Sequence, residues 1–340
     1  MTAFFAEYGL FLLKTVTIVV AFVVIIGVIA SASRKSGVHE GLEVEHLNKK
    51  YHALANSLKH AVMKKSDWKK EAKAEKARDK AQAKSEEVRR RAFVINFKGD
   101  LKASAVPSLR EEVSAVLEVA TTDDQVVICL ENYGGVVHEH GLAASQLVRI
   151  RDKEIPLTVV VDKVAASGGY LMACVANKIL AAPFAILGSI GVIAQIPNFS
   201  RLMDKRGIDF EQVTAGKYKR NVTMFGKNTD EDRAKLKEEL EDVHALFKDA
   251  VARYRPNLDL DRIATGEHWY GTRALEMGLA DELKTSDELL AELAKDHDLY
   301  RLSYKIKLPL QKRLMASADA VFERVESSGW RRRFESRLPR

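Results

Sequence analysis

The chain has 340 residues, of which 46% are hydrophobic and 30% are charged, and its formal net charge is +7. A chain of this length and composition can bury a substantial core, in one large domain or in two. The positive charge favours an anionic membrane surface over nucleic acid, because no nucleic-acid-binding motif with interleaved aromatic residues is present. We therefore expect no nucleic-acid partner.

The N-terminal segment, residues 1–33, predicts a membrane anchor. Thr15–Ser33 carries no charged residue and is rich in Val, Ile, Ala and Phe. With the apolar residues before it, this stretch is long enough to cross a hydrocarbon core of about 30 Å as a helix. A cleavable signal peptide is the alternative, because Ala30-Ser31-Ala32 offers small residues at a cleavage-like spacing. The length of the apolar run favours an uncleaved anchor.

Residues 34–91 read as a charged linker. The segment is rich in Lys, Arg, Glu and Ala, and from Met63 to Arg91 both signs of charge are mixed with strong helix formers. This pattern predicts either a long solvated helix stabilised by pairs of opposite charge one turn apart or a disordered linker.

Strands and helices alternate in the next region, residues 92–300. Nearly continuous apolar stretches predict strands at residues 92–97, 125–130 and 157–161. Amphipathic stretches predict helices at residues 105–120, 141–151 and 230–254. Repeated β-α-β units with apolar strands indicate an α/β fold, in which helices cover both faces of a parallel sheet.

A serine marks the turn that follows the strand at residues 157–161. The sequence Ala165-Ala166-Ser167-Gly168-Gly169-Tyr170 turns sharply into a predicted helix. Because glycine has no Cβ, the N–H of Gly168 can point at the oxygen of a carbonyl that Ser167 attacks, which would form half of an oxyanion hole. The alternative is that Ser167 only caps the helix. The motif differs from the Gly-x-Ser-x-Gly turn of the α/β-hydrolases, and no Asp and His follow in that family's order with comparable sequence context, so a nucleophilic serine needs another base.

A second apolar run, residues 179–196, invites comparison with a membrane helix. Pro183, Gly188 and Gly191 break it into strand and turn pieces, so we interpret it as buried core.

Cations gather after a strand that we predict at residues 210–213. The segment Thr214-Ala-Gly-Lys-Tyr-Lys-Arg220 contains two lysines and an arginine. A lysine acts as a general base only when neutral, which requires burial or neighbouring positive charge. A solvated basic loop is the alternative reading.

Together, three segments in fixed order resemble the signal peptide peptidase A family of membrane-bound serine proteases. They are Val161-Asp-Lys-Val-Ala-Ala-Ser-Gly-Gly-Tyr170, Gly188-Ser-Ile-Gly-Val192 and Thr214-Ala-Gly-Lys-Tyr-Lys219. The resemblance extends over nearly the whole chain, including the anchor and the charged region. It implies the ClpP/crotonase fold, for a protease domain at residues 92–300.

The resemblance also assigns roles to individual residues. It implies that Ser167 is the nucleophile, that Lys219 is its general base, and that Ser189 orients the lysine. Gly168 and Gly134 would supply the oxyanion donors. The family commonly has Ser-Pro before the glycine pair that contains Gly134, whereas this chain has Asn-Tyr.

The resulting expectation is a serine endopeptidase with a Ser-Lys dyad that cleaves hydrophobic or unfolded peptide segments. The resemblance implies a homo-oligomer in the bacterial inner membrane, single-pass and with a periplasmic catalytic domain. The cations after the anchor, among them Arg34 and Lys35, argue for a cytoplasmic domain instead. We expect no cofactor and no metal.

Several alternatives stay open. A crotonase-like acyl-CoA enzyme would use a carboxylate base, and a non-catalytic membrane scaffold would use the charged linker to recruit partners. His138 and His140 follow the first glycine pair, so a Ser-His arrangement is conceivable. Cys129 and Cys174 lie in apolar runs and read as small core residues. The basic tail, residues 301–340, fits a membrane surface, a neighbouring subunit or a frayed end.

Overall fold

The computed structural model describes residues 9, 11–20, 40–82 and 89–306. These residues fall into two compact units, one holding the residues up to Gly41 together with Lys305 and Ile306, the other holding Leu42–Tyr304. In the first unit, residues 11–20 are helical and their large apolar side chains are exposed. The predicted anchor lies mostly outside the described residues. Over the ranges that are described, no helix has both the length and the apolar character needed to span a bilayer.

The second unit is built on one ten-stranded sheet of the described residues. Its main path runs in the order β1 (Gly41–His46), β10 (His297–Lys305), β2 (Arg90–Gly99), β3 (Gln125–Asn132), β4 (Leu157–Val161), β6 (Lys178–Ala181) and β9 (Glu282–Leu283). A branch leaves β3 and contains β5 (Val164–Ala166), β7 (Ile186–Gly188) and β8 (His268–Tyr270). The pairs from β10 to β9, and those of β5 with β3 and β7, are parallel, and β7 pairs with β8 antiparallel.

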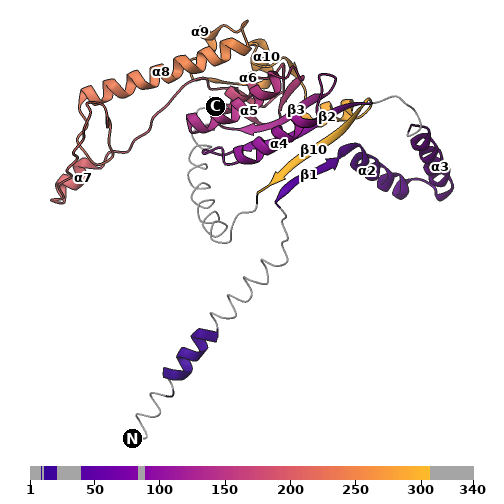
Figure 1. The fold of residues 1–340 in the computed structure, drawn as a ribbon, viewed down its shortest axis with the longest axis horizontal. Helices are drawn as coiled ribbons and strands as arrows, with labels where there is room; N and C mark the ends of the chain where they lie inside the picture. Colours follow the sequence, from indigo (N-terminus) through magenta and orange to yellow (C-terminus); the bar gives the residue numbers. More distant parts are fainter. Residues whose placement is uncertain (1–8, 10, 21–39, 83–88, 307–340) are drawn as a thin grey trace. The chain divides into compact units, whose positions relative to one another are not determined.

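Helices cover both faces of this sheet (Figure 1). Side chains alternate along β2, so that Phe93, Ile95 and Phe97 pack on one face and Ala92 and Val94 on the other. The first face is covered by α4 (Val106–Val119), α5 (Val137–Arg151), α6 (Gly168–Cys174) and part of α8 (Asp230–Tyr254). On the second face, α11 (Ser286–Leu293) and the first turn of α2 (Leu47–Val62) pack against the sheet, and the rest of α2 is largely exposed. The predicted α/β fold with a parallel sheet between helices is confirmed.

Four further helices belong to this unit, and two of them each bury one side chain, Ile263 or Ala274, in the core of the first face. They are α3 (Lys65–Gln82), α7 (Ser200–Lys205), α9 (Leu260–Ile263) and α10 (Gly271–Glu276). The region predicted as a charged linker contains α2, α3 and the edge strand β1, and Leu47 at the start of α2 is fully buried against the sheet. The tail predicted from residue 301 begins within β10, and residues 307–340 lie outside the described part of the chain.

Two sequence predictions fail for the part of the chain that follows β7. The strand predicted at residues 210–213 is wrong: these residues have no regular structure and are exposed. The apolar run at 179–196 forms β6, β7 and buried core as far as Ile190, but Ile193 and Ile196 are exposed. Both differences have one cause, because residues 191–229 form an arm that extends away from the sheet with α7 on it (Figure 1).

Candidate active site

Ser167 lies at the turn between β5 and α6. Its backbone angles are φ 52° and ψ −120°, in a region that L-residues rarely adopt. The turn is held from both sides, because the Ser167 N–H donates to the Gly188 carbonyl at 2.8 Å and the Ser167 carbonyl accepts from Leu171 N–H at 3.0 Å. Strained backbone of this kind persists only where the surrounding structure enforces it, and it is concentrated at functional sites.

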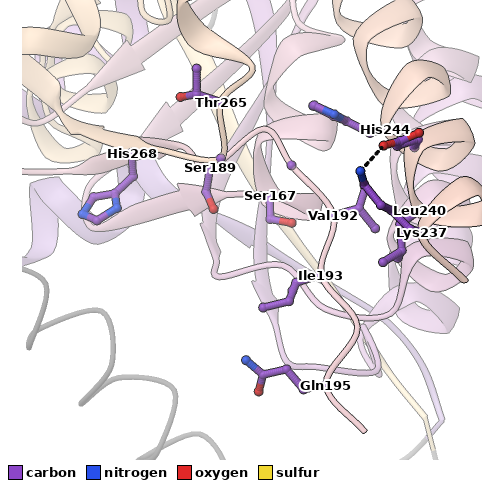
Figure 2. A pocket seen from close by; sticks show the side chains of 13 residues that line it. Ser167, Ser189, Val192, Ile193, Gln195, Lys237, Leu240, His244, Thr265 and His268 are labelled. Carbon is purple, nitrogen blue, oxygen red and sulfur yellow. Dashed lines mark ion pairs between the residues drawn. The ribbon is translucent and has the colours of Figure 1, made fainter. Parts of the chain in front are cut away.

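Ser189 occupies the equivalent position on the neighbouring strand. In the parallel pair of β5 and β7, Ala166 lies opposite Gly188, so the next residue on each strand is a serine. Ser189 also has a positive φ, 53°, and its N–H donates to the Glu267 carbonyl at 2.6 Å. Both serines line the same pocket, and Figure 2 shows their side chains on one wall of it. The register of β5 and β7 therefore brings the predicted nucleophile and the predicted orienting serine together.

The pocket beside Ser167 has a volume of about 460 Å³. Its walls are the ends of β5 and β7, the first residues of the arm, one face of α8, and the segment 265–268. Val192, Ile193 and Leu240 make part of the wall apolar. On α8, the ammonium of Lys237 lies 3.4 Å from a carboxylate oxygen of Glu241, the ion pair drawn in Figure 2. The pocket thus combines the predicted nucleophile with an apolar surface and a charged helix face.

The glycines predicted to stabilise an oxyanion both lie against Ser167. Gly134 has φ +85°, and a Cβ added to it would lie 2.8 Å from the Ser167 Cβ and from the Gly168 nitrogen. Gly168 is the first residue of α6, where backbone N–H groups have no partner within the helix. The N–H of Gly134, in contrast, donates to Oδ1 of Asn132 at 2.9 Å. The two loops are in place, but one of the two predicted donors is already engaged.

Lys219 is not brought to this pocket. Its side chain is exposed on the arm, in a turn where its own N–H donates to the Gly216 carbonyl at 3.2 Å. The surrounding turn is tied to the first half of α8, since Lys217 pairs with Glu231 at 2.9 Å and Tyr218 lies under the ammonium of Lys235. The structure therefore assembles the serine side of the predicted dyad and leaves the predicted base outside it.

Neither candidate histidine lines the pocket beside Ser167. His138 has an 82% exposed side chain. His140 is fully buried, and its ring nitrogens face the Val136 carbonyl at 3.0 Å and Oδ1 of Asn132 at 3.2 Å. Burial lowers the pKa of His140 below its ordinary value, which keeps the imidazole neutral.

Burial also affects the thiols of Cys129 and Cys174. Burial raises the pKa of Cys129 to about 11 and that of Cys174 to about 12, so both stay protonated. Both are free cysteines. Nowhere in the described ranges do three His, Cys, Asp or Glu side chains gather as a metal site would require.

Comparisons with known proteins identify the family. Residues 3–147 match the N-terminal region of peptidase family S49, and residues 149–300 match peptidase family S49 itself. A probable protease SohB from Haemophilus influenzae is 44% identical over 326 residues, which are 92% of each chain. The chain belongs to peptidase family S49. A probable protease SohB from Buchnera aphidicola is 52% identical over 229 residues, or 67% of this chain and 68% of the relative.

More distant S49 proteins and solved structures were also matched. A putative signal peptide peptidase SppA from Enterococcus faecium is 29% identical over 177 residues, about half of each chain (51%). The solved structure of the 1510-N membrane-bound stomatin-specific protease with a substrate peptide is 12% identical, with a TM-score of 0.38, and covers 68% of this chain and 99% of its own. The predicted resemblance to a serine protease family is confirmed by the S49 membership.

Four residues of the pocket were not predicted from the sequence. Lys237, Leu240, Glu241 and His244 line the pocket from one face of α8, at the three- and four-residue spacing of a helix. Nε2 of His244 is buried and has no hydrogen-bond partner in the described part of the chain. The spacing alone is that of any amphipathic helix, so only the position of α8 over Ser167 reveals these side chains as part of the site.

Proposed function

We propose that this chain is a serine endopeptidase in which Ser167 is the nucleophile and Lys219 is the general base. The observation that carries the proposal is the backbone of Ser167, held at positive φ at the end of a buried strand and opening on a pocket. Membership of a peptidase family supports peptide-bond hydrolysis as the chemistry. The ClpP/crotonase form of the α/β fold is part of the same proposal.

The proposed reaction proceeds through an acyl-enzyme. Neutral Lys219 takes the proton of Ser167, whose Oγ then bonds to the carbonyl carbon of the substrate peptide. The N–H groups of Gly168 and Gly134 stabilise the negative oxygen. Lys219 returns the proton to the leaving amine as the C–N bond breaks. Water then gives a proton to the same lysine and attacks the ester carbonyl, and the lysine passes that proton to Ser167 Oγ as the ester C–O bond breaks. The Ser189 hydroxyl makes the hydrogen bond that orients the Lys219 side chain.

The proposal requires Lys219 to reach Ser167 from outside the pocket. Two routes meet that requirement: the arm of residues 191–229 closes over its own pocket, or the arm of a second copy delivers the lysine. The expected homo-oligomer supplies the second route. Apolar side chains on the arm, among them Ile208 and Val213, are exposed and would be covered in either arrangement.

The cellular setting is also proposed. An N-terminal single-pass anchor would hold the protease in the bacterial inner membrane, with hydrophobic or unfolded peptide segments as substrates and the catalytic domain on the periplasmic side. The apolar pocket wall of Val192, Ile193 and Leu240 is suited to such segments. A reporter fused after Arg340 tests the orientation, because activity confined to the cytoplasm would reverse it.

The decisive experiment follows cleavage of unfolded casein by the detergent-purified full chain. We expect Ser167→Ala and Lys219→Ala each to lower kcat by about 1,000-fold or more. Lys217→Ala is the matched control, since Lys217 lies on the same turn and pairs with Glu231. Its activity should stay within about twofold of the wild type.

Mixing the two inactive variants distinguishes the routes for the lysine. Recovery of activity in the mixture means that serine and lysine come from different copies, and no recovery means that the arm closes within one copy. If Lys237→Ala abolishes cleavage and Lys219→Ala does not, the base is the lysine that lines the pocket on α8, and the proposed dyad is wrong.

A further inference from the structure

Two polar side chains are completely buried beneath the glycine turns of the site. Asn132 ends β3 and His140 lies in the first turn of α5, and both have no exposed surface. They contact the turn that follows Ser167: a Cβ on Gly168 would lie 2.6 Å from the His140 side chain, and one on Gly169 would lie 2.2 Å from the Asn132 carbonyl oxygen. Nothing in the proposed reaction uses either side chain, although a buried polar pair is costly to retain.

Asn132 controls an N–H group that the reaction needs. Its Oδ1 accepts the hydrogen bond from Gly134 N–H at 2.9 Å and lies 3.2 Å from Nε2 of His140. Its Nδ2 donates to the sulfur of Met172 at 3.3 Å, a weak acceptor. In this arrangement, the Gly134 N–H points at Asn132 and not at an oxygen bonded to Ser167.

The tautomer of the His140 imidazole indicates a second orientation of the Asn132 side-chain amide. A neutral imidazole has one N–H, but both of its nitrogens here face oxygen acceptors, Val136 O at 3.0 Å and Asn132 Oδ1 at 3.2 Å. With Nε2–H donating to Asn132 Oδ1, Nδ1 faces the Val136 carbonyl without a proton; with Nδ1–H donating to Val136, Nε2 carries a lone pair and needs a donor. A half-turn of the Asn132 amide meets that need, because Nδ2 then donates to Nε2 and Oδ1 turns toward Met172. The same half-turn removes the acceptor that holds the Gly134 N–H.

We propose that Asn132 and His140 are positioning residues that switch the Gly134 N–H between Asn132 and the substrate oxyanion. In the present structure, Asn132 Oδ1 holds the Gly134 N–H. When the amide turns over, the bond from Gly134 to Asn132 breaks, a bond from Asn132 to His140 forms, and the freed N–H donates to the oxyanion beside Gly168. The inference rests on the proposed serine chemistry and adds the residues that complete its oxyanion hole.

The switch predicts a specific kinetic signature for Asn132→Asp. Aspartate has nearly the shape of asparagine but no donor, so it keeps accepting from the Gly134 N–H in either orientation. We expect kcat to fall about 100-fold while KM changes by less than about threefold, as for loss of one oxyanion donor. The inhibition constant of a peptide aldehyde, which forms a tetrahedral adduct on the serine, should rise by the same factor as kcat falls.

A pair of His140 variants tests the same switch from its other side. His140→Leu removes the acceptor for the turned amide and should lower kcat in the same direction. His140→Gln should restore kcat to within about fivefold of the wild type, because its carbonyl accepts from Asn132 and its NH₂ donates to Val136. His138→Gln is the control on the same helix, since the His138 side chain is 82% exposed.

The measurements use the full chain in detergent, with thermal unfolding recorded first. Cleavage is followed on a quenched peptide taken from the first casein site, and the aldehyde has the same sequence. Wild-type kcat and aldehyde affinity in Asn132→Asp would overturn the switch, as would equal losses of substrate and aldehyde affinity, which indicate a merely structural role. If Asn132→Asp does not fold, the two His140 variants decide alone. A wild type without Ser167-dependent cleavage overturns the proposed function and this inference together.

Discussion

The two regions that would have to meet for catalysis are built very differently. The Ser167 turn follows Ala165 and Ala166, both fully buried, and main-chain hydrogen bonds fix it to the neighbouring β7. The arm of residues 191–229 has one short helix, α7, and an exposed surface from Ile208 to Lys219. Within the arm, a few side-chain contacts stabilise the fold, such as the stacked rings of Phe199 and Phe225, whose centroids are 6.1 Å apart.

This difference separates the tasks of the two regions. The sheet fixes Ser167, the proposed nucleophile, and Ser189 through the register of β5 and β7. The arm is held only at the surface, by contacts such as the Lys217–Glu231 ion pair, and such exposed pairs contribute about 1 kcal/mol or less. A site made of one rigid and one weakly held region can be switched by moving the arm, while the serine stays in place.

The largest effect on stability is expected from Gly169→Ala, a substitution in the rigid region. A Cβ at this position would lie 2.2 Å from the Asn132 carbonyl oxygen, and both groups belong to buried backbone. Relieving that clash requires α6 to move away from β3, so we expect the free energy of unfolding to fall by about 3 kcal/mol or more. Urea unfolding followed by circular dichroism measures the loss, and labelling by a fluorophosphonate probe should disappear with it.

Gly141→Ala is the matched control in the neighbouring helix α5. A Cβ there meets no atom within 4 Å. Since alanine favours a helix by up to about 1 kcal/mol over glycine, stability should stay constant or rise. If the two substitutions cost the same, the close packing of the glycine turns does not determine the rigidity of this region.

The sequence predicted the rigid region far better than the arm. Apolar strands and the small residues around Ser167 are local signals, and they predicted the parallel sheet, the turn and the two glycine loops. The strand predicted at residues 210–213 failed because Phe210 and Val213 are apolar yet exposed, and a local pattern cannot tell which apolar side chains find a partner. The link between Asn132 and His140 was missed for the reason that it depends on tertiary contact between the end of β3 and α5.

Asp281→Asn tests α8, the helix that connects the two regions. At its C-terminal end, the Arg255 guanidinium donates to both Asp281 oxygens at 2.6 and 2.9 Å, and Ile179 N–H adds a third bond at 2.7 Å. Burial raises the pKa of Asp281, but these hydrogen bonds outweigh it and the net shift is downward. Removing the charge leaves Arg255 unpaired, so the free energy of unfolding at pH 7 should fall by about 2 kcal/mol.

The pH dependence of this loss of stability shows whether it comes from the Asp281 charge. A carboxylate whose pKa is depressed by folding stabilises the protein above its unfolded value of about 3.9, and the stabilisation disappears as the pH falls through the folded value. Wild type and Asp281→Asn should therefore differ most near neutral pH and converge in acid, in urea unfolding at a series of pH values. A difference that is constant down to acid would assign the effect to packing and not to charge.

The smallest effect on stability is expected from Phe225→Ala in the arm. Phe225 contacts Phe199 and, at 5.9 Å between ring centroids, Phe210, yet its side chain remains 43% exposed. Aromatic pairs of this kind contribute about 1 kcal/mol, and a segment with so few contacts to the sheet can open without unfolding the core. Brief thermolysin digestion should therefore cut within residues 191–229 faster than in the wild type, while the urea midpoint of the sheet stays constant.

Val213→Ala, at a 96% exposed position, should change neither quantity. A fall in global stability as large as that of Gly169→Ala would mean that arm and sheet unfold as one unit, and the separation of a fixed serine from a movable lysine would then fail.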